Sequence, residues 1–365
     1  MARITKPNAR AERVFTLREL NRALLERQFL LRRRGLGPVD AIERLAGLQA
    51  QWPKSPYLAL WSRLQGFKRD DLTRALEERK VVKATLMRAT LHIVSSDDYL
   101  QFAAALRGPA LAGLTIRAQK AVPDLDLVRF ARETLRRAGD GPHRRRDLVP
   151  EAASGDVQGW VRWHALKAHG YLLDAPPSAY WRGFGESGPY VTARSWLGRE
   201  PGDEHTGRVH LVRRYLAAFG PATTGDIAYW SGLSRTRLEA ALAELEVELR
   251  HFRDEKGRPL LDLRHAPLPD PETAAPIRFL ARWDASLLGH APPERERILA
   301  ESLRKTVIRN NGDVLQSVLV DGFVTALWNI DKKGELQIEP LRRLTKAERA
   351  AIDEEGEGLV RFVSD

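Results

Sequence analysis

The order of predicted elements repeats along the chain, and this repetition limits the possible folds more than any other feature of the sequence. One copy consists of a helix at 127–135, a turn at Gly141-Pro142, a helix at 157–169 and strands near 170–173 and 189–192. The next copy consists of a helix at 211–216, a turn at Gly220-Pro221, a helix at 235–246 and strands at 247–252 and 259–263. Helices followed by a β-hairpin are typical of a winged helix.

The same order is found at the start of the chain. A helical leucine pattern begins at Leu17, and a further helix is predicted at 70–78, ahead of strands at 81–86 and 90–94. The third copy carries the clearest helix-turn-helix signal, because Ser234 is suited to cap a helix whose first turn holds Arg235 and Arg237. We therefore expect an α+β protein in which three tandem winged-helix units form a concave DNA-binding surface.

The C-terminal quarter has a different character. Two apolar strands, 314–320 and 323–328, flank Asp321-Gly322, a pair that favours the positive φ angles of a type I′ turn. A strand at 336–341 and a helix at 345–355 follow. The predicted organisation is a basic tail at 1–14, winged helices at 15–120, 121–208 and 209–266, a proline-rich linker at 267–276, and a small α+β region at 277–365.

Charge and composition bear on partners and compartment. The 365 residues include 59 Lys and Arg against 48 Asp and Glu, a formal net charge of +11, and such an excess favours binding to phosphate backbones. A chain without cysteine has no disulfides or thiolate metal ligands. No stretch resembles a signal peptide or a membrane span. We expect a monomeric, cytoplasmic, nucleoid-associated protein that binds double-stranded DNA and needs no metal or cofactor.

The segment Leu48-Gln49-Ala50-Gln51-Trp52-Pro53 places two uncharged amides close together. A helix predicted at 39–50 should end here, because the residue before a proline disfavours the helical conformation. In an ideal helix the two glutamines would point about 200° apart, whereas an extended or terminating segment lets both act on one water molecule. The alternative is that they cap free backbone carbonyls.

Three motifs together resemble the AlkZ/YcaQ-like winged-helix DNA glycosylases, a family that includes the azinomycin-resistance enzyme. Gln49-Ala50-Gln51 is similar to the family's Gln-apolar-Gln signature, and Arg88-Ala89-Thr90-Leu91-His92 resembles its Arg-x-Thr-x-His segment. A third match, Arg282-Trp283-Asp284-Ala285, resembles its C-terminal motif that contains an aspartate. The second glutamine places the chain nearer the AlkZ-like branch, since YcaQ-like relatives have Asp at that position.

The resemblance implies a monofunctional DNA glycosylase that hydrolyses the N-glycosidic bond of alkylated purines. The implied substrates are N7-alkylguanine, bulky adducts and interstrand crosslinks, and Gln49 and Gln51 are the implied catalytic residues. An alkylated purine is cationic and leaves readily, so two amides that place a water and stabilise an oxocarbenium-like sugar suffice without a strong base. The competing hypothesis is a non-enzymatic winged-helix DNA-binding protein, either a transcription regulator or an architectural protein.

Further residues are candidates for support or DNA contact. Arg88, Thr90 and His92 either contact the damaged strand or brace the glutamines, Trp52 belongs to the core in preference to stacking on a base, and Asp284 is expected to brace the site. Recurring arginines are the candidates for phosphate binding, with a solvated surface as the alternative. They are Arg32, Arg33, Arg34, Arg144, Arg145, Arg146, Arg213, Arg214, Arg235 and Arg237.

Overall fold

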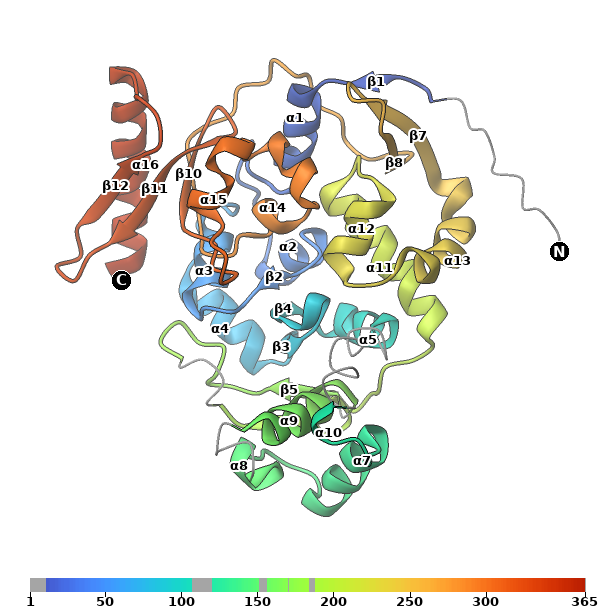
Figure 1. The fold of residues 1–365 in the computed structure, drawn as a ribbon. Coiled ribbons are helices and arrows are strands. Elements are labelled where there is room, and N and C mark those ends of the chain that lie inside the picture. Colours follow the sequence, from blue (N-terminus) through green and yellow to red (C-terminus); the bar gives the residue numbers. More distant parts are fainter. Residues whose placement is uncertain (1–10, 107–119, 151–155, 170, 184–187, 365) are drawn as a thin grey trace.

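A computed structural model describes residues 11–106, 120–150, 156–169, 171–183 and 188–364. Residues 1–10 of the predicted basic tail and residues 107–119 at the end of the predicted first unit lie outside this description. The helices of the described part are α1 Leu17–Arg27, α2 Pro38–Arg44, α3 Lys54–Trp61, α4 Arg69–Glu77, α5 Ser96–Ala105, α7 Leu127–Ala138, α8 Arg145–Leu148, α9 Val157–His169, α10 Ala193–Leu197, α11 Glu204–Phe219, α12 Thr224–Ser231, α13 Arg235–Leu245, α14 Ala285–Leu288, α15 Arg304–Val307 and α16 Lys346–Ser364 (Figure 1). None of them has the length and apolar character that a membrane span requires.

The strands of the described residues form three sheets. They are β1 Val14–Phe15, β2 Leu48–Gln49, β3 Val81–Thr85, β4 Leu91–Ser95, β5 Leu172–Asp174, β6 Tyr190–Thr192, β7 Leu249–Asp254, β8 Pro259–Leu263, β9 Arg278–Leu280, β10 Ser317–Val320, β11 Phe323–Ile330 and β12 Leu336–Pro340. The strand orders are β2-β4-β3-β5-β6, β1-β7-β8 and β12-β11-β10-β9. The hairpins predicted from the sequence are confirmed, whereas each of the three sheets also contains a strand from a distant segment.

The five-stranded sheet joins the first two repeats. Strand β3 of the first repeat pairs with β5 of the second, with Ala84 opposite Leu173, so the boundary expected near residue 120 does not separate two sheets. Alternate residues of this sheet pack into two different cores. Ala84, Val94 and Leu173 face one core, and Leu48 and Ile93 face the other.

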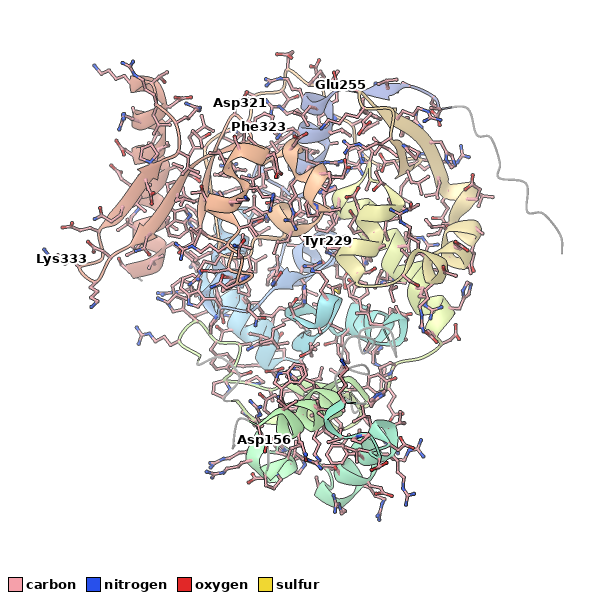
Figure 2. All side chains as sticks on the ribbon, in the orientation of Figure 1. Asp156, Tyr229, Glu255, Asp321, Phe323 and Lys333 are labelled. Atoms are coloured by element: carbon pink, nitrogen blue, oxygen red, sulfur yellow. The ribbon has the colours of Figure 1, made fainter. Side chains whose placement is uncertain are left out.

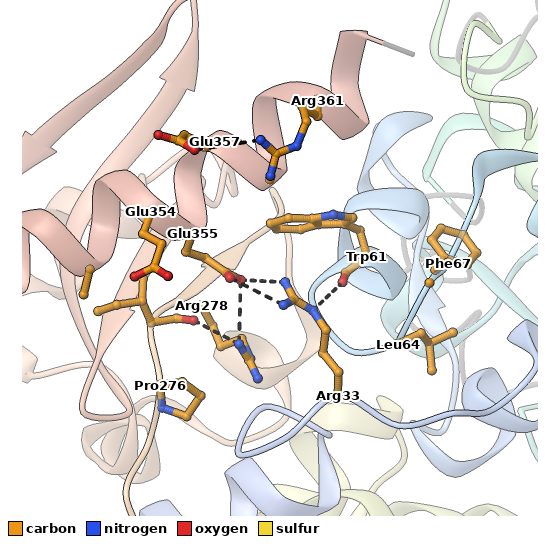
Figure 3. A pocket seen from close by; sticks show the side chains of 14 residues that line it. Arg33, Trp61, Leu64, Phe67, Pro276, Arg278, Glu354, Glu355, Glu357 and Arg361 are labelled. Atoms are coloured by element: carbon orange, nitrogen blue, oxygen red, sulfur yellow. Dashed lines mark hydrogen bonds and ion pairs between the residues drawn. The ribbon is translucent and has the colours of Figure 1, made fainter.

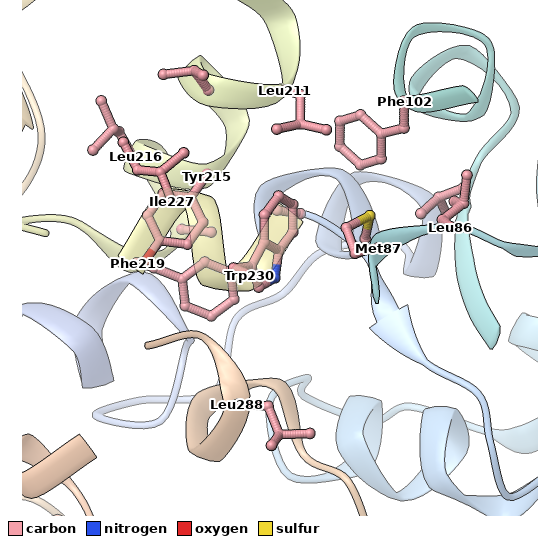
Figure 4. Packing of buried hydrophobic residues seen from close by; sticks show 14 of the residues in the cluster. Leu86, Met87, Phe102, Leu211, Tyr215, Leu216, Phe219, Ile227, Trp230 and Leu288 are labelled. Carbon is pink, nitrogen blue, oxygen red and sulfur yellow. The ribbon is translucent and has the colours of Figure 1, made fainter. Parts of the chain in front are cut away.

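The first of these cores links the sheet to the third repeat. Trp230 of α12 lies 5.1 Å from Tyr215, 5.9 Å from Phe219 and 6.3 Å from Phe102 between ring centres. Figure 4 shows this indole between side chains of α11 and the loop after β3, where Met87 is fully buried. The third repeat is therefore packed directly against the hairpin of the first.

The third repeat has the expected helix-turn-helix order. Helix α12 ends at Gly232, which has the positive φ of 81° that a left-handed helix end favours. Helix α13 begins after Ser234, although the Ser234 side chain makes no cap hydrogen bond. Strand β1, from the start of the chain, pairs in parallel with β7 and extends this wing by one strand.

The proline-rich segment 267–276 is fixed in place by arginines of α1. Arg18, Arg22 and Arg27 donate side-chain hydrogen bonds to backbone carbonyls within this segment. Arg22 and Arg18 also pair with Asp321, at the turn between β10 and β11. That turn has the predicted form, with φ of 46° at Asp321 and 82° at Gly322, and Figure 2 shows Asp321 next to the upper end of the molecule.

Helix α16 is longer than the predicted helix 345–355 and encloses a cavity of about 810 Å³ with α3 and the segment before β9. Glu355 of α16 pairs there with Arg33 at 2.5 Å and with Arg278 at 3.6 Å (Figure 3). Burial is the main cause that lowers the pKa of Arg278 to about 10. Charged side chains therefore attach α16 to the rest of the molecule, at a cavity that neither Gln49 nor Gln51 lines.

Candidate active site

The Gln-Ala-Gln motif begins on strand β2 and continues just beyond it, so the predicted helix over 39–50 was wrong in its second half. Helix α2 ends at Arg44, because Ala46 and Gly47 have positive φ angles of 57° and 92°. A Cβ on Gly47 would lie 2.7 Å from Val94 Cγ1, so a residue without a side chain is needed where β2 approaches β4. The turn at residues 46 and 47 converts the chain from helix to strand just before Gln49.

Gln49 belongs to the strand that pairs with β4, and Gln51 follows two residues later, just after this pairing ends. Gln49 lies opposite His92 in the antiparallel register, and the Ala50 N–H continues the pairing by donating to the Leu91 carbonyl at 2.7 Å. Residues two apart on an extended segment direct their side chains to the same face. The Gln49 side chain lies on the face that packs toward α11 and α12, since His92 lies opposite both Gln49 and Ala84.

The two amides differ in their surroundings. Gln49 is only 8% exposed, and no described residue makes a hydrogen bond with its side-chain amide. Gln51 is exposed, and its Oε1 accepts a hydrogen bond from the Leu91 N–H at 3.3 Å. Most of the Gln49 residue is buried, but its amide atoms are not among the buried polar atoms that lack a partner. Gln49 is thus able to bind a water or a ligand.

His92 lies beside Gln49 in the sheet and is 4% exposed. Burial, followed by the nearby positive charge of Arg88, lowers the pKa of His92 to about 3. The ring is therefore neutral near pH 7, and its Nδ1 lies 3.0 Å from the Thr90 carbonyl oxygen. Thr90 itself donates from its hydroxyl to the Met87 carbonyl at 3.0 Å, which fixes the loop between β3 and β4.

Arg88 projects from that loop toward the third repeat. Its Nη1 donates to the Trp230 carbonyl at 2.6 Å, and its guanidinium carbon lies 5.8 Å from the ring centre of Tyr229. Gly232 allows this approach, since a Cβ there would lie 3.3 Å from the Arg88 nitrogen. Arg88 and His92 therefore both lie on the hairpin of β3 and β4, and β4 is the strand that pairs with Gln49.

Trp52 and two residues of the third motif form a second group beside the glutamines. Trp52 is half-buried against the core on the other side of the sheet, and its ring centre lies 6.0 Å from the Arg282 guanidinium carbon. Arg282 also lies 4.7 Å from the ring centre of Trp283 and pairs with Asp313 at 2.5 Å. The motif that contains Arg282 therefore lies close to Trp52, the residue after Gln51.

Asp284 has only structural contacts among the described residues. Its carboxylate accepts two hydrogen bonds from the buried Arg63 guanidinium, at 2.7 and 2.9 Å, and caps α14 by accepting from the Ser286 N–H at 3.0 Å. Burial alone would raise the pKa of Asp284, but the charge and hydrogen bonds of Arg63 outweigh it and hold this pKa below its usual value. Asp284 and Arg63 therefore form an internal ion pair that does not reach the glutamines.

Many of the arginines expected to bind phosphate are already neutralised. Five have close carboxylate partners: Arg33 with Glu355, Arg34 with Glu26, Arg213 with Glu248, Arg214 with Asp98 and Glu43, and Arg237 with Glu204. Arg32 and Arg146 lie 3.7 Å from Glu26 and Asp147, Arg145 lies over the Trp163 ring, and Arg144 and Arg235 are exposed. The paired arginines are weaker candidates than their spacing in the sequence indicated.

Sequence reasoning missed Tyr229 and Arg295, which the fold brings next to Arg88. The Tyr229 ring centre lies 5.2 Å from the Arg295 guanidinium carbon, and Arg295 donates to the Tyr229 hydroxyl at 2.7 Å. Tyr229 belongs to α12 and Arg295 to the 3-10 helix η5 at Pro292–Arg297. No local pattern marks either residue, since only the packing of distant segments places them near the hairpin.

Comparisons with known proteins agree with this architecture. The solved structure of the Streptomyces sahachiroi DNA glycosylase AlkZ matches with a TM-score of 0.79 at 21% identity, over 94% of this chain and 95% of that one. The fold is therefore that of a winged-helix DNA glycosylase. A curated relative, the interstrand DNA cross-link repair glycosylase of Streptomyces sahachiroi, is 27% identical over 354 residues, which is 92% of this chain and 94% of the relative.

The family model of the AlkZ-like DNA glycosylases matches residues 42–362. The chain belongs to this family and is an enzyme of the class that acts on N-glycosyl bonds. The matched range includes both glutamines and the segments that carry Arg88, Arg282 and Arg295.

Proposed function

We propose that the protein is a monofunctional DNA glycosylase that removes alkylated purines from double-stranded DNA, with Gln49 and Gln51 as its catalytic residues. The observation that carries this proposal is Gln49, a residue that is only 8% exposed and whose amide has no hydrogen-bond partner among the described residues. Gln49 lies two residues before Gln51, on β2, which pairs with β4. Membership of the AlkZ-like family supplies the reaction class.

The proposed reaction is hydrolysis at the anomeric carbon. The bond between C1′ of deoxyribose and N9 of the purine breaks, and its electron pair neutralises the positive charge that alkylation placed on the base. The oxygen of a water forms the new bond to C1′, and one proton of that water passes to solvent. Because the base leaves without protonation, the site needs no strong general acid.

Two amides are suited to this reaction. A side-chain carbonyl oxygen accepts a hydrogen bond from the attacking water and places its negative end toward a cationic sugar. In this proposal Gln49 and Gln51 share both tasks. The neutral state of His92, whose pKa is about 3, agrees with a site in which uncharged groups surround the sugar.

The substrates that we propose are N7-alkylguanine, bulky adducts and interstrand crosslinks. The curated relative is named as an interstrand cross-link repair glycosylase, and this name is the basis for extending the proposal to crosslinks. Base-flipping enzymes enclose the extruded base in a pocket, and the cavity at α16 is not lined by either glutamine. We further propose that the protein acts as a monomer, without a metal or cofactor.

The test uses three duplexes that carry N7-methylguanine, a bulky N7 adduct or an N7–N7 interstrand crosslink. Each is incubated with the full-length protein, and abasic sites are detected as strand breaks after alkali. We expect breaks only after alkali treatment, since a monofunctional enzyme does not cut the backbone. The proposal fails if no abasic sites form above the background of heat-denatured protein on any of the three substrates.

A further inference from the structure

Two guanidinium groups meet at the exposed ring of Tyr229, and no carboxylate of the described residues lies within ion-pair distance of either. Arg88 comes from the loop between β3 and β4, and Arg295 comes from η5. Their guanidinium carbons lie 5.8 and 5.2 Å from the ring centre of Tyr229, which is 38% exposed. Figure 2 shows Tyr229 in the central part of the molecule.

Both arginines are bound only by neutral oxygen atoms in the described structure. Arg88 donates to the Trp230 carbonyl, and Arg295 donates to the His290 carbonyl at 3.1 Å and to the Tyr229 hydroxyl. Arg295 is 4% exposed. An arginine keeps its charge in a protein, and a buried charge without a counterion is costly. The energetic cost indicates that an anion completes this group of side chains.

Other arginines of the protein have carboxylate partners, which supports the inference that Arg88 and Arg295 bind an anion. Arg213 donates two hydrogen bonds to the Glu248 carboxylate, and Arg63 donates two to the Asp284 carboxylate. Arg88 and Arg295 instead lie close enough for the charge of Arg295 to lower the pKa of Arg88, an effect secondary to burial. Two cations held near each other without an acid form a site for a phosphate, which accepts hydrogen bonds from several donors at once.

The backbone that carries Arg88 is held in an uncommon conformation. Arg88 and Ala89 have φ angles of 54° and 58°, values that residues with a side chain rarely adopt and that are costly unless the surroundings impose them. Hydrogen bonds between Leu86 and Thr90 close the loop on itself, with the Leu86 N–H donating to the Thr90 carbonyl at 3.0 Å. The loop thus fixes the direction of Arg88 before any ligand binds.

This cationic pair lies close to the proposed catalytic residues along the same hairpin. His92 is opposite Gln49, and the charge of Arg88 acts on His92. The Gln51 side chain accepts from the Leu91 N–H, three residues after Arg88. An anion between Arg88 and Arg295 would therefore lie at the end of the sheet where Gln51 lies.

We propose that Arg88 and Arg295, with Tyr229 between them, bind one backbone phosphate of the lesion-bearing DNA strand next to the damaged nucleotide. Tyr229 orients Arg295 through its hydroxyl, and the bound phosphate positions the adjoining sugar for Gln49 and Gln51. This inference rests on the proposed function, because it takes damaged DNA as the ligand. The phosphate site consists of residues from the first repeat, the third repeat and the C-terminal region.

The test measures binding to a duplex with a tetrahydrofuran abasic analogue, which cannot be hydrolysed. Each phosphate around the analogue is replaced in turn by an uncharged methylphosphonate. For the wild-type protein we expect one phosphate whose neutralisation weakens binding by about tenfold, the size of one charge-assisted contact. The Arg88→Gln variant should bind the unmodified duplex about tenfold more weakly and show no further loss at that phosphate.

Further variants keep the test informative if a buried substitution disturbs folding. Tyr229→Phe retains the ring and removes the hydroxyl that holds Arg295, so we expect a smaller loss of affinity at the same phosphate. Arg129→Gln removes an exposed arginine that pairs with Glu133 on α7, and it should keep the full position-specific effect. Circular dichroism and thermal unfolding check that each variant is folded.

Two results would overturn the phosphate site: no sensitive phosphate in the wild-type protein, or an unchanged sensitivity in folded Arg88→Gln. Binding to the analogue does not require base release, so the two proposals fail separately. Base release without a sensitive phosphate removes only the phosphate site. A sensitive phosphate without base release from any adduct removes only the proposed function.

Discussion

At the scale of single residues, His92 determines which charges surround Gln49. The folded protein keeps this buried ring neutral to about pH 3, whereas a histidine in an unfolded chain titrates near pH 6.5. Burial also lowers the pKa of His290 well below its usual value. Between these pH values the unfolded chain binds protons that the folded protein does not bind. Protons therefore favour unfolding, and the free energy of unfolding falls as the pH drops below about 6.5.

We predict that replacing His92 by Gln reduces this pH dependence. Each buried histidine contributes a slope of about 1.4 kcal/mol per pH unit in the range where only the unfolded chain is protonated. Denaturant unfolding at pH 7 and pH 5 measures the slope for the wild-type protein and for His92→Gln. The variant should retain only the contribution of His290 and other groups. An identical pH dependence in both proteins would show that His92 titrates normally in the folded state.

The ion pair between Arg63 and Asp284 leads to a second residue-scale prediction. Asp284→Asn leaves the fully buried Arg63 without a counterion, and we expect the free energy of unfolding to fall by about 3–5 kcal/mol. Glu133→Gln is the matched control, since it breaks the exposed pair with Arg129 and should leave stability unchanged. Denaturant unfolding compares the two variants. Unchanged stability of Asp284→Asn, with loss of base release alone, would assign Asp284 a direct role in catalysis.

At the scale of elements, β2 shows where the sequence misleads. The apolar positions of residues 39–50 repeat at helical spacing, and nothing in that pattern signals that Ala46 takes a φ of 57°. The helix was expected to end at the motif, because Pro53 follows Trp52, but it ends at Arg44, before the motif begins. Its pairing with β4 depends on residues more than forty positions away. Local signals predicted the existence of the hairpins, and only tertiary contacts define their partners.

We predict that Gly47→Ala impairs both stability and base release. The positive φ alone costs about 1–2 kcal/mol for a residue with a side chain, and the new Cβ would overlap Val94 and push β2 away from β4. The control is Gly37→Ala, at a φ of −68° with no atom within 4 Å of the new Cβ, which should cost less than about 1 kcal/mol. Thermal unfolding and single-turnover base release are measured for both. Equal behaviour of the two variants would contradict the packing described for β2.

At the scale of the whole molecule, the repeats were visible in the sequence, but their association was not. The five-stranded sheet combines strands of two repeats, and β1 joins the wing of the third. These pairings join segments that no local pattern connects. The sequence also does not show which acidic residues pair with the arginines. The sequence shows that Arg213 and Arg33 lie in basic runs, whereas Glu248 and Glu355, which neutralise them, come from other elements. Arg295 became a candidate only when the fold placed it near Arg88.

The structure brings together some of the residues that the sequence predicted for the site, but not all of them. Gln49, Gln51, Arg88 and His92 lie close together because two adjacent strands and one loop carry them. Asp284 lies in a separate buried ion pair. The roles of these residues in catalysis stay predictions, and the account depends most on the two amides.

The most direct measurement of this central claim is the single-turnover rate of base release from an N7-methylguanine duplex by Gln49→Ala and Gln51→Ala. Gln65→Ala, an exposed glutamine on another segment, is the control. We predict that both motif variants lose base release by at least about a hundredfold, the scale of a lost transition-state contact. Their affinity for the abasic-analogue duplex should stay within a few fold of the wild type, because neither residue neutralises a phosphate. Wild-type rates in both folded variants, or a loss of DNA binding equal to the loss of rate, would contradict the account.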